Sequence, residues 1–526
     1  MIGVCCQDDE LPVAAEFFEL FKTPWSRCDE AAGHDVVIVS TPCPASSVDA
    51  RLVIVLPPAS GADLASQSPL RPVTVESDGI RLPIYCGVRG EPVVVERDSV
   101  DRILVRCGYN VFSEVRHLLT SGQPPEFART PTLDLHIELL RRWIADAGVS
   151  YVEIPPVPAG ADLLACLTHD VDFLGMRRHG LDATLLGFLH RATIGSLLDC
   201  VTGRRSVRQL LRNWLAALAV PLVHAHVLAD PWIPFDRYAA VEGDLRSTFF
   251  VVPFAGRAGR GLDGPADRRR AVPYGVDETA PYLEPVRATG CEIGVHGLDA
   301  WCDVTRGREE RAAVAAVTGA DSLGVRMHWL LFDEGAPATL EEAGYDYDSS
   351  VGYNDAAGFR AGTTQAYRPL SCEHLLELPL HVQDTALLYP RRMHLRERDA
   401  LDLCAVLIDR TQELGGVLTI SWHERSLAPE RQWDRVYGEL LATLRHRGAA
   451  IMTAADAVAW FRLRRSVDLE GADVPGAAFP AERGEIADGE TMLRLRSHGA
   501  GGGHVDVPVP VEALRRLASE RRVAEV

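Results

Sequence analysis

The sequence predicts an α/β protein built on a parallel sheet. Short apolar runs typical of buried strands alternate with helical patterns along most of the chain. Several of these runs end in His, Asp or Arg. In α/β folds the carboxyl ends of parallel strands meet at one edge, where catalytic sites lie. One polar strand end is easily accidental, but four or five together indicate a shared site.

The most informative stretch is residues 163–172, LLACLTHDVD. Its small and apolar residues predict a strand that is buried on both faces, as in a parallel sheet. The strand ends in His169, Asp170 and Asp172. Charged groups are costly in the interior unless they are paired or bind a metal. Taken alone, this end could equally be two acids that meet solvent.

Length and composition bound the class of protein. The chain has 526 residues, which exceeds one ordinary domain, and 47% of them are hydrophobic and 24% charged, as in globular proteins with a large core. The net charge of -19 argues against nonspecific binding of nucleic acid or of an anionic membrane. We expect the basic runs at 268–270 and 462–465 to be solvated helix or loop faces.

The expected compartment is the cytoplasm. The N-terminus lacks the basic and apolar regions of a signal peptide, and no apolar stretch has the length of a membrane span. The 12 cysteines are scattered without a CxxC pair, which suits reduced thiols better than disulfides.

The chain divides into three expected parts. Residues 1–125 form a small accessory α/β domain without a catalytic constellation, residues 126–465 hold the polar strand ends, and residues 466–526 are an appendage without chemistry. The first part has strand-like runs at 36–40, 51–56, 92–96 and 103–106 and a helix at 110–120. The third has a hairpin that pairs 491–495 with 505–510, followed by a short helix.

The second part carries most of the expected strands. A helix at 133–147 precedes the strand at 163–172, and the helical periodicity of 183–228 predicts an insertion at about 180–230, either a lid or a dimer surface. Further strands are expected at 247–252, 291–295, 324–328, 376–380, 416–421 and 449–453, and helices at 277–289 and 454–464.

The polar strand ends resemble the motifs of a known family. Thr168-His-Asp-Val-Asp172 is similar to the first motif of the polysaccharide deacetylases, the NodB-homology carbohydrate esterases. Other segments match later motifs in the same order: STFFV at 247–251, EIGVH at 292–296, VRMHW at 325–329, YDSS at 347–350 and ISWH at 420–423. The resemblance spans about 160–460. The N-terminal part resembles the accessory region of a bacterial subgroup that has this HDVD signature.

The resemblance implies a distorted, incomplete β/α barrel and hydrolysis of an N-acetyl group on a sugar with a divalent metal, Zn²⁺ in particular. Position by position, Asp170 would be the general base and Asp172 and His296 metal ligands. Arg326 would orient Asp170, and His423 would be the general acid. A carboxylate beside a metal and an arginine stays ionised and can accept a proton from water, while histidine has a pKa suited to protonating a leaving amine.

The sequence departs from the family at the third metal ligand. The family has a second histidine four residues after the first, but Ala300 stands at that distance from His296. We expect His328, at the end of the neighbouring strand, to replace it. Asp299 and His169 are the alternatives, and a loss of metal binding is another.

Four residues are candidates for substrate binding: Trp329, Trp422, Asp348 and Asp384. The tryptophans could stack on a sugar or pack in the core. Asp348 or Asp384 could instead orient His423, as an acid orients a catalytic histidine.

The predicted function is therefore a metal-dependent hydrolase that removes an N-acetyl group from an amino sugar or glycan. The alternatives are a metal-free carbohydrate-binding pseudoenzyme and a hydrolase of a non-sugar amide. The expected partner is a carbohydrate and not a nucleic acid.

Overall fold

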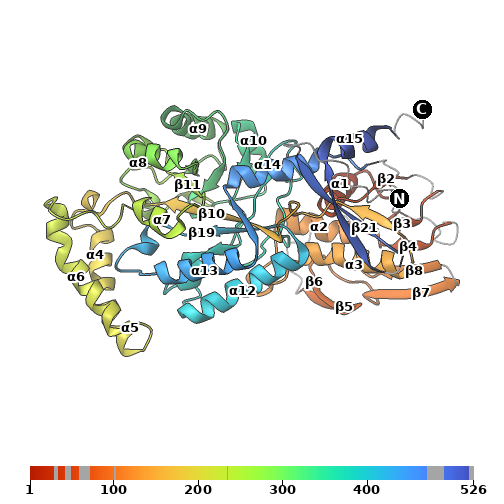
Figure 1. Cartoon of the computed structure of the whole chain (residues 1–526), viewed down its shortest axis with the longest axis horizontal. Coiled ribbons are helices and arrows are strands. Elements are labelled where there is room, and N and C mark those ends of the chain that lie inside the picture. The colour runs from red at the N-terminus through yellow and green to blue at the C-terminus, as the bar shows by residue number, and fades with distance from the viewer. Residues whose placement is uncertain are drawn as a thin grey trace.

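The computed structural model of the chain describes all residues except 29–32, 42–48, 59–71, 100–101, 234, 471–490, 501 and 521–526. Figure 1 shows an elongated molecule with the N-terminal part at one end, a central sheet wrapped by helices, and a group of helices that projects at the other end.

The central sheet is built around β10 (Leu163–Val171), whose nine residues are all buried. It has nine strands in the order β17-β16-β15-β14-β11-β10-β19-β18, with β20 paired to β10, and every pairing is parallel. The other strands are β11 (Thr248–Val251), β14 (Glu292–Gly297), β15 (Val325–Met327), β16 (Tyr347–Asp348), β17 (Leu376–Glu377), β18 (Val382–Gln383), β19 (Val417–Ser421) and β20 (Ala449–Met452). The predicted parallel sheet is confirmed.

The sheet is strongly curled. Arg326 in β15 and Asp170 in β10 belong to strands three places apart, which a flat sheet would separate by about 14 Å at the usual strand spacing of about 4.8 Å. Yet Arg326 Nη1 lies 3.0 Å from Asp170 Oδ1. His423 reaches the same carboxylate from β19, on the other side of β10. No described residues of β17 and β18 pair to close the ring, so the fold is the incomplete β/α barrel that the resemblance implies.

Helices cover the convex side of this barrel. They are α7 (Phe235–Glu242), α8 (Val276–Ala288), α9 (Val304–Thr318), α10 (Ala336–Ala343), α12 (Glu397–Leu414) and α13 (Asp434–His446), whereas α14 (Ala454–Arg465) packs in a separate cluster with Leu164 and Cys166 of β10. The buried faces of the other helices form the largest apolar cluster with alternate residues of the strands, such as Leu163, Ala165 and Leu167 of β10. The strand tips that carry polar residues are thereby fixed on a rigid frame.

The N-terminal part has its own sheet of order β2-β1-β3-β4-β8-β7. These strands are β1 (Ile2–Cys5), β2 (Trp25–Arg27), β3 (Val36–Val39), β4 (Leu52–Val55), β7 (Val93–Ser99) and β8 (Arg102–Cys107), and only the β7–β8 pair is antiparallel. The helices α1 (Leu11–Phe21), α2 (Val111–Thr120) and α3 (Thr132–Asp146) contribute to its core. Thus α3, which the sequence assigns to the second part, packs on the first.

The segment between β10 and β11 is helical, as the periodicity predicts. It contains α4 (Ala183–His190), a π-helical turn at Arg191–Gly195, α5 (Ser196–Val201) and α6 (Val207–His224). These helices project from the body of the molecule at the left of Figure 1. Among the described helices, none is long and apolar enough to cross a membrane.

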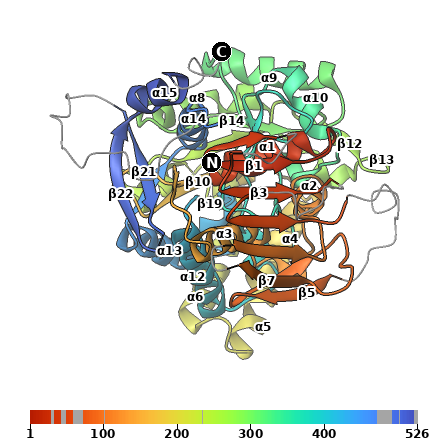
Figure 2. The same cartoon turned by 90° about the vertical axis from the view of Figure 1, so that its right-hand side faces the viewer.

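The C-terminal part joins the fold through a small sheet. The hairpin of β21 (Met492–His498) and β22 (His504–Pro510) pairs with β9 (Tyr151–Glu153), and α15 (Val511–Glu520) follows. Figure 2 shows this hairpin beside the N-terminal sheet. Residues 471–490, 501 and 521–526 of the expected appendage lie outside the described residues.

The two basic runs are solvated only in part: Arg268, Arg269 and Arg462 are exposed, as the sequence predicts, but one arginine of each run is not. Arg270 and Arg464 are almost fully buried. Arg464 donates to the carbonyl oxygens of Leu20 and Ile154 at 3.0 and 2.7 Å. Each of these two arginines donates hydrogen bonds to backbone carbonyl groups and so holds loops of the chain together. The guanidinium groups can be buried because these carbonyl groups satisfy their donors.

Candidate active site

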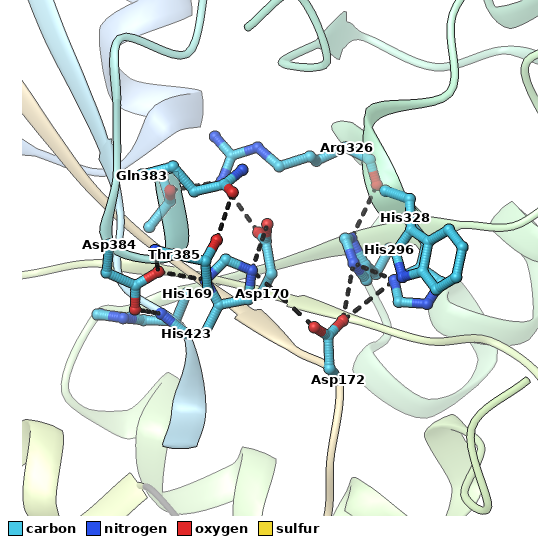
Figure 3. Close-up of polar contacts among 12 residues, drawn as sticks. His169, Asp170, Asp172, His296, Arg326, His328, Gln383, Asp384, Thr385 and His423 are labelled. Carbon is cyan, nitrogen blue, oxygen red and sulfur yellow. Dashed lines mark hydrogen bonds and ion pairs between the residues drawn. The ribbon is translucent and has the colours of Figure 1, made fainter. Parts of the chain in front are cut away.

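Asp172, His296 and His328 lie together at the ends of three strands. Asp172 follows β10, His296 is in β14, and His328 directly follows β15. Asp172 Oδ1 lies 3.3 Å from His296 Nε2 and 3.1 Å from His328 Nδ1. The candidate ligand atoms of the three residues lie within 4.8 Å of one another, and the side chains converge in Figure 3.

The outer nitrogens of the two histidines are bound by backbone carbonyls. His296 Nδ1 lies 3.0 Å from the oxygen of Arg326, and His328 Nε2 lies 3.1 Å from the oxygen of Arg270. Because a carbonyl only accepts, each outer nitrogen carries the proton and donates. Burial also lowers the pKa of His328, which favours its neutral ring.

The inner atoms of the cluster then form a set of acceptors without a donor. The nitrogen atoms His296 Nε2 and His328 Nδ1 lie 2.9 Å apart, and each has its lone pair on the inner side. They face Asp172 Oδ1, a buried oxygen that has no hydrogen bond within the described part of the chain. Converging acceptors of this kind fit a cation. Two imidazoles and one carboxylate are ligands that Zn²⁺ accepts in catalytic sites, with a position left open.

Asp170 is fixed by a buried arginine. Arg326 donates from Nη1 to Asp170 Oδ1 at 3.0 Å and to Thr168 Oγ1 at 2.5 Å, and from Nε to the oxygen of Ser349 at 3.0 Å. Burial alone would raise the pKa of Asp170, but the guanidinium of Arg326 outweighs it and, with His296 and His423, lowers the pKa below its usual range. Asp170 is therefore ionised at neutral pH.

His423 is held by a second buried acid, Asp384. His423 Nδ1 lies 2.6 Å from Asp384 Oδ1, and the backbone N–H of His423 donates to Asp384 Oδ2 at 2.7 Å. The other ring nitrogen, Nε2, lies 3.9 Å from a carboxylate oxygen of Asp170 and of Asp172. Burial disfavours the charged ring, but Asp384 outweighs it and raises the pKa of His423 to about 10.

The alternative third ligands lie elsewhere. The ring nitrogens of His169 lie 2.8 Å from the oxygen of Trp422 and 2.8 Å from Glu242 Oε1, so both are occupied inside the core. Asp299 Oδ1 accepts from the backbone N–H of Arg260 at 2.6 Å. Within the described chain, the metal-ligand cluster contains neither residue.

A pocket of about 300 Å³ opens over the cluster, and only one of the four predicted substrate-binding residues lines it. That residue is Trp329, which is 44% exposed. Trp422 is fully buried and stacks on Tyr437 at a ring distance of 5.1 Å. Asp348 and Asp384 are also fully buried. The expectation of direct substrate contact is therefore wrong for these three, although Asp384 orients His423 as the alternative expectation states.

The pocket also contains residues that the sequence analysis missed. Gln383 and Thr385, on either side of Asp384, line it, as do Asn354, Tyr389 and four arginines. Glu424 follows His423, and its Oε2 accepts from the backbone N–H of Asp172 at 3.0 Å. Glu424 and Gln383 are each adjacent in sequence to a predicted residue, which is the signal that could have indicated them.

The chain has remote matches among solved structures. No protein-family model and no curated protein matches the sequence. Solved structures do match. One, from Mycobacterium smegmatis and assigned to the polysaccharide deacetylases, is 16% identical over 60% of this chain and 96% of its own, with a TM-score of 0.37. The chain resembles polysaccharide deacetylases.

Two further structures widen that likeness. Puue allantoinase is 16% identical over 58% of this chain and 92% of its own, with a TM-score of 0.33. Agd3, described as a novel carbohydrate deacetylase, is 8% identical over 95% of this chain and 91% of its own, with a TM-score of 0.31. The identities are 16% or less and the TM-scores 0.37 or less, and membership of the HDVD subgroup stays a prediction.

Proposed function

We propose that the protein is a metal-dependent hydrolase that removes an N-acyl group, such as acetyl, from an amino sugar. The observation that supports this most is the set of three acceptors from Asp172, His296 and His328 beside an ionised Asp170. A divalent cation held there would polarise the amide carbonyl and make water a better nucleophile near neutral pH.

The residues around the cluster would move the protons. Asp170, kept ionised by Arg326, is placed to accept a proton from the attacking water. His423 Nε2 faces the same space, and Asp384 fixes the ring through Nδ1, so His423 is placed to protonate the leaving amine. The proton thus passes from water to Asp170 and from His423 to the nitrogen.

Trp329 offers a half-exposed ring at the pocket wall, and sugar rings stack on such surfaces. This supports an amino sugar over a simple amide as the substrate. An acyl amide that lacks a sugar ring would leave this wall without a contact.

The test is a joint measurement of metal content and acetate release. Purified protein is expected to bind about one Zn²⁺ per chain by elemental analysis and to release acetate from N-acetylglucosamine oligomers. His328→Ala should lose both, because removal of one of three ligands leaves an incomplete site. Asp170→Asn should keep the metal and lose at least 100-fold in kcat, as for removal of a general base.

His374→Ala is the matched control, since this histidine is 88% exposed and should change neither readout. Wild-type protein that binds glycan but no metal would instead favour the metal-free carbohydrate-binding protein. Acetate release from simple amides alone would favour the non-sugar hydrolase.

A further inference from the structure

The pocket has a second polar wall that the proposed reaction does not use. Its cationic residues are Arg191, Arg392, Arg425 and Arg431. They come from the helical insertion, from the segment after α11 (Asp384–Leu388), and from the segment after β19. The acids that line the pocket, among the described residues, are Asp170 and Asp172, and both belong to the catalytic end.

Two of these arginines already have structural partners. Arg425 donates to Glu430 Oε1 at 2.9 Å from Nη2, and its guanidinium lies 4.0 Å from the centre of the Trp232 ring. Arg431 donates to Ser426 Oγ at 3.3 Å and has no carboxylate within ion-pair distance in the described chain.

Arg191 and Arg392 have no such partners. Within the described residues, neither guanidinium has a hydrogen bond or an ion pair, and Arg191 Nε and Arg392 Nη1 are buried. Buried donors without acceptors are rare in folded proteins, and they mark places where a ligand or water completes the bonding.

The local backbone directs Arg191 into this position. It begins a π-helical turn, a feature that often occurs at functional sites. A Cβ atom at Gly187, one turn earlier, would lie 3.1 Å from Arg191 Nη1, so the guanidinium crosses the helix where no side chain stands. Burial, Arg425 and Arg431 lower the pKa of Arg191 to about 10, which leaves it charged at neutral pH.

We propose that Arg191, Arg392 and Arg431 bind an anionic group of the substrate, so that the enzyme acts on N-acylated amino sugars that carry a phosphate or a carboxylate. Guanidinium groups bind the oxygens of both anions in pairs. This inference rests on the proposed function, since it assigns the substrate class of the same pocket.

The test compares acetate release from N-acetylglucosamine, N-acetylglucosamine 1-phosphate and N-acetylmuramic acid. The metal-loaded enzyme should prefer at least one anionic sugar by tenfold or more in kcat/KM, and which one is preferred identifies the anion. Arg191→Gln and Arg392→Gln should each lower this preference about tenfold, as expected for one charge-assisted hydrogen bond. Arg391→Gln, a neighbouring exposed arginine outside the pocket lining, is the matched control.

Binding of the same sugars to metal-loaded Asp170→Asn protein, measured by calorimetry, separates the two proposals. If the variant bound the anionic sugars tightly while the wild-type enzyme released no acetate from any of the three sugars, the anion site would be supported and the proposed reaction contradicted. Equal turnover of neutral and anionic sugars, or arginine variants that weaken both equally, would overturn the anion site alone.

A different observation concerns the helical insertion. Of the 20 large hydrophobic side chains that are exposed in the described chain, 14 lie within 181–228. In α6 they occur at positions 207, 211, 214, 215, 218 and 222, which is the spacing of one helix face. We call these six residues the α6 apolar face. Figure 1 shows that α6 projects away from the barrel.

The charge of this segment is opposite to that of the whole protein. Residues 181–228 contain five arginines and two aspartates, a local charge of +3, in a chain of net charge -19. The arginines at 204, 205, 208 and 212 lie at the N-terminal end of α6. An apolar helix face beside basic residues is typical of helices that lie in the surface of an anionic membrane.

We infer that the α6 apolar face binds the surface of an anionic membrane. A symmetric contact with a second copy is the less favourable occupant, because it would bring two patches of charge +3 together. The net charge of -19 argues against membrane binding, but it is a sum over the whole chain, whereas residues 181–228 carry a local charge of +3.

The test is flotation of the full chain with vesicles of phosphatidylcholine alone or with 30% phosphatidylglycerol. Wild-type protein should float with the anionic vesicles, and a Leu211→Ser/Leu215→Ser/Leu218→Ser variant at least tenfold less. Arg208→Gln should lower the partition coefficient about fivefold. Leu262→Ser, at a residue 61% exposed outside the insertion, is the control. Wild-type protein that does not float, or a dimer that the triple variant dissociates, would overturn the inference.

Discussion

Asp384 is a buried acid whose oxygens are directed at the backbone and ring of His423. Because asparagine cannot accept from both the backbone N–H and the ring N–H, Asp384→Asn should release the ring from its productive orientation. We expect kcat to fall at least 100-fold, with KM and metal content within about twofold of wild type. Steady-state kinetics and elemental analysis check this.

Asp399→Asn on the surface of α12 provides the control for an aspartate-to-asparagine change. If Asp384→Asn lost its metal along with its activity, Asp384 would support the whole site rather than orient His423.

The sequence indicates most of the residues at the cluster because they end strands. Asp172, His296 and His328 lie at the ends of three apolar runs, those of β10, β14 and β15, and parallel strands place such residues at one edge. Trp422 was misplaced because successive residues near a strand end point to opposite sides, so His423 and Trp422 do not both face the pocket. Arg191 comes from the helical insertion and Arg392 from a turn after α11, neither within a motif, and only the folded chain brings them to one pocket.

At the scale of elements, the segment that contains Arg270 acts as a clamp on the tips of β14 and β15. Arg270 donates from Nη2 to the carbonyl oxygens of Leu298 and His328 at 2.8 and 3.1 Å, while its own carbonyl accepts from His328 Nε2. Arg270→Met should lower Zn²⁺ affinity about 10- to 100-fold, the usual effect of losing an interaction that orients a ligand. Competition with a zinc chelator measures this affinity.

Arg269→Met is a control from the same basic run, since Arg269 is exposed. Unchanged Zn²⁺ affinity in Arg270→Met protein would mean that the strand tips hold His328 without the clamp.

The edge strand β17 and its neighbour β16 contain a buried pair of acids, Asp348 and Glu377. Burial raises the pKa of Asp348 to about 6 and, together with Asp348, raises that of Glu377 well above its usual range. Between the ordinary pKa of a carboxyl, about 4, and the raised pKa values of the folded chain, the unfolded chain binds fewer protons than the folded chain. The stability that the protonated pair contributes below pH 4 is therefore lost as the pH rises through 6 and beyond.

Glu377→Gln should remove much of this pH dependence. Its amide oxygen can still accept from the backbone N–H of Val351, and its NH₂ can donate to Asp348 Oδ2, which lacks a partner among the described residues. We expect a higher Tm than wild type at pH 8 and a similar Tm at pH 5. Glu373→Gln, 88% exposed, is the control, and a parallel Tm profile for Glu377→Gln and wild type would contradict the raised pKa values of the pair.

The short strands β16, β17 and β18 also show where sequence patterns fail to predict a strand. The run at 376–380 predicts a strand of five residues, but only Leu376–Glu377 pairs in the sheet. β16 and β18 have two residues each, too few for a periodicity. The long, apolar β10 and β19 were predicted closely because burial on both faces leaves a continuous signal.

At the scale of the whole molecule, buried contacts connect the three expected parts of the chain. Arg464 of α14 donates to carbonyl groups of the N-terminal part, and Arg465 Nη2 lies 2.6 Å from Glu16 in α1. Composition alone does not reveal such contacts, because each forms between segments more than 400 positions apart. The expected boundary near 125 lies in a Pro-rich stretch, GQPPE at 122–126, yet α3 beyond it packs in the core of the N-terminal part.

A chain cut at this boundary tests how far the parts depend on one another. Leu139, Leu140 and Trp143 of α3 line one small internal cavity with Ile38 and Ile54 of the N-terminal sheet. Each buried side chain of this size contributes about 1.5–3 kcal/mol, so exposing three costs roughly 5–9 kcal/mol, comparable with the 5–15 kcal/mol that stabilises a typical protein. Residues 126–526 alone should therefore be recovered mainly in the insoluble fraction, whereas the full chain should be recovered in the soluble fraction. Co-expression of residues 1–125 as a separate chain should restore soluble protein, and a soluble 126–526 fragment that melts cooperatively and binds Zn²⁺ would show that the barrel folds alone.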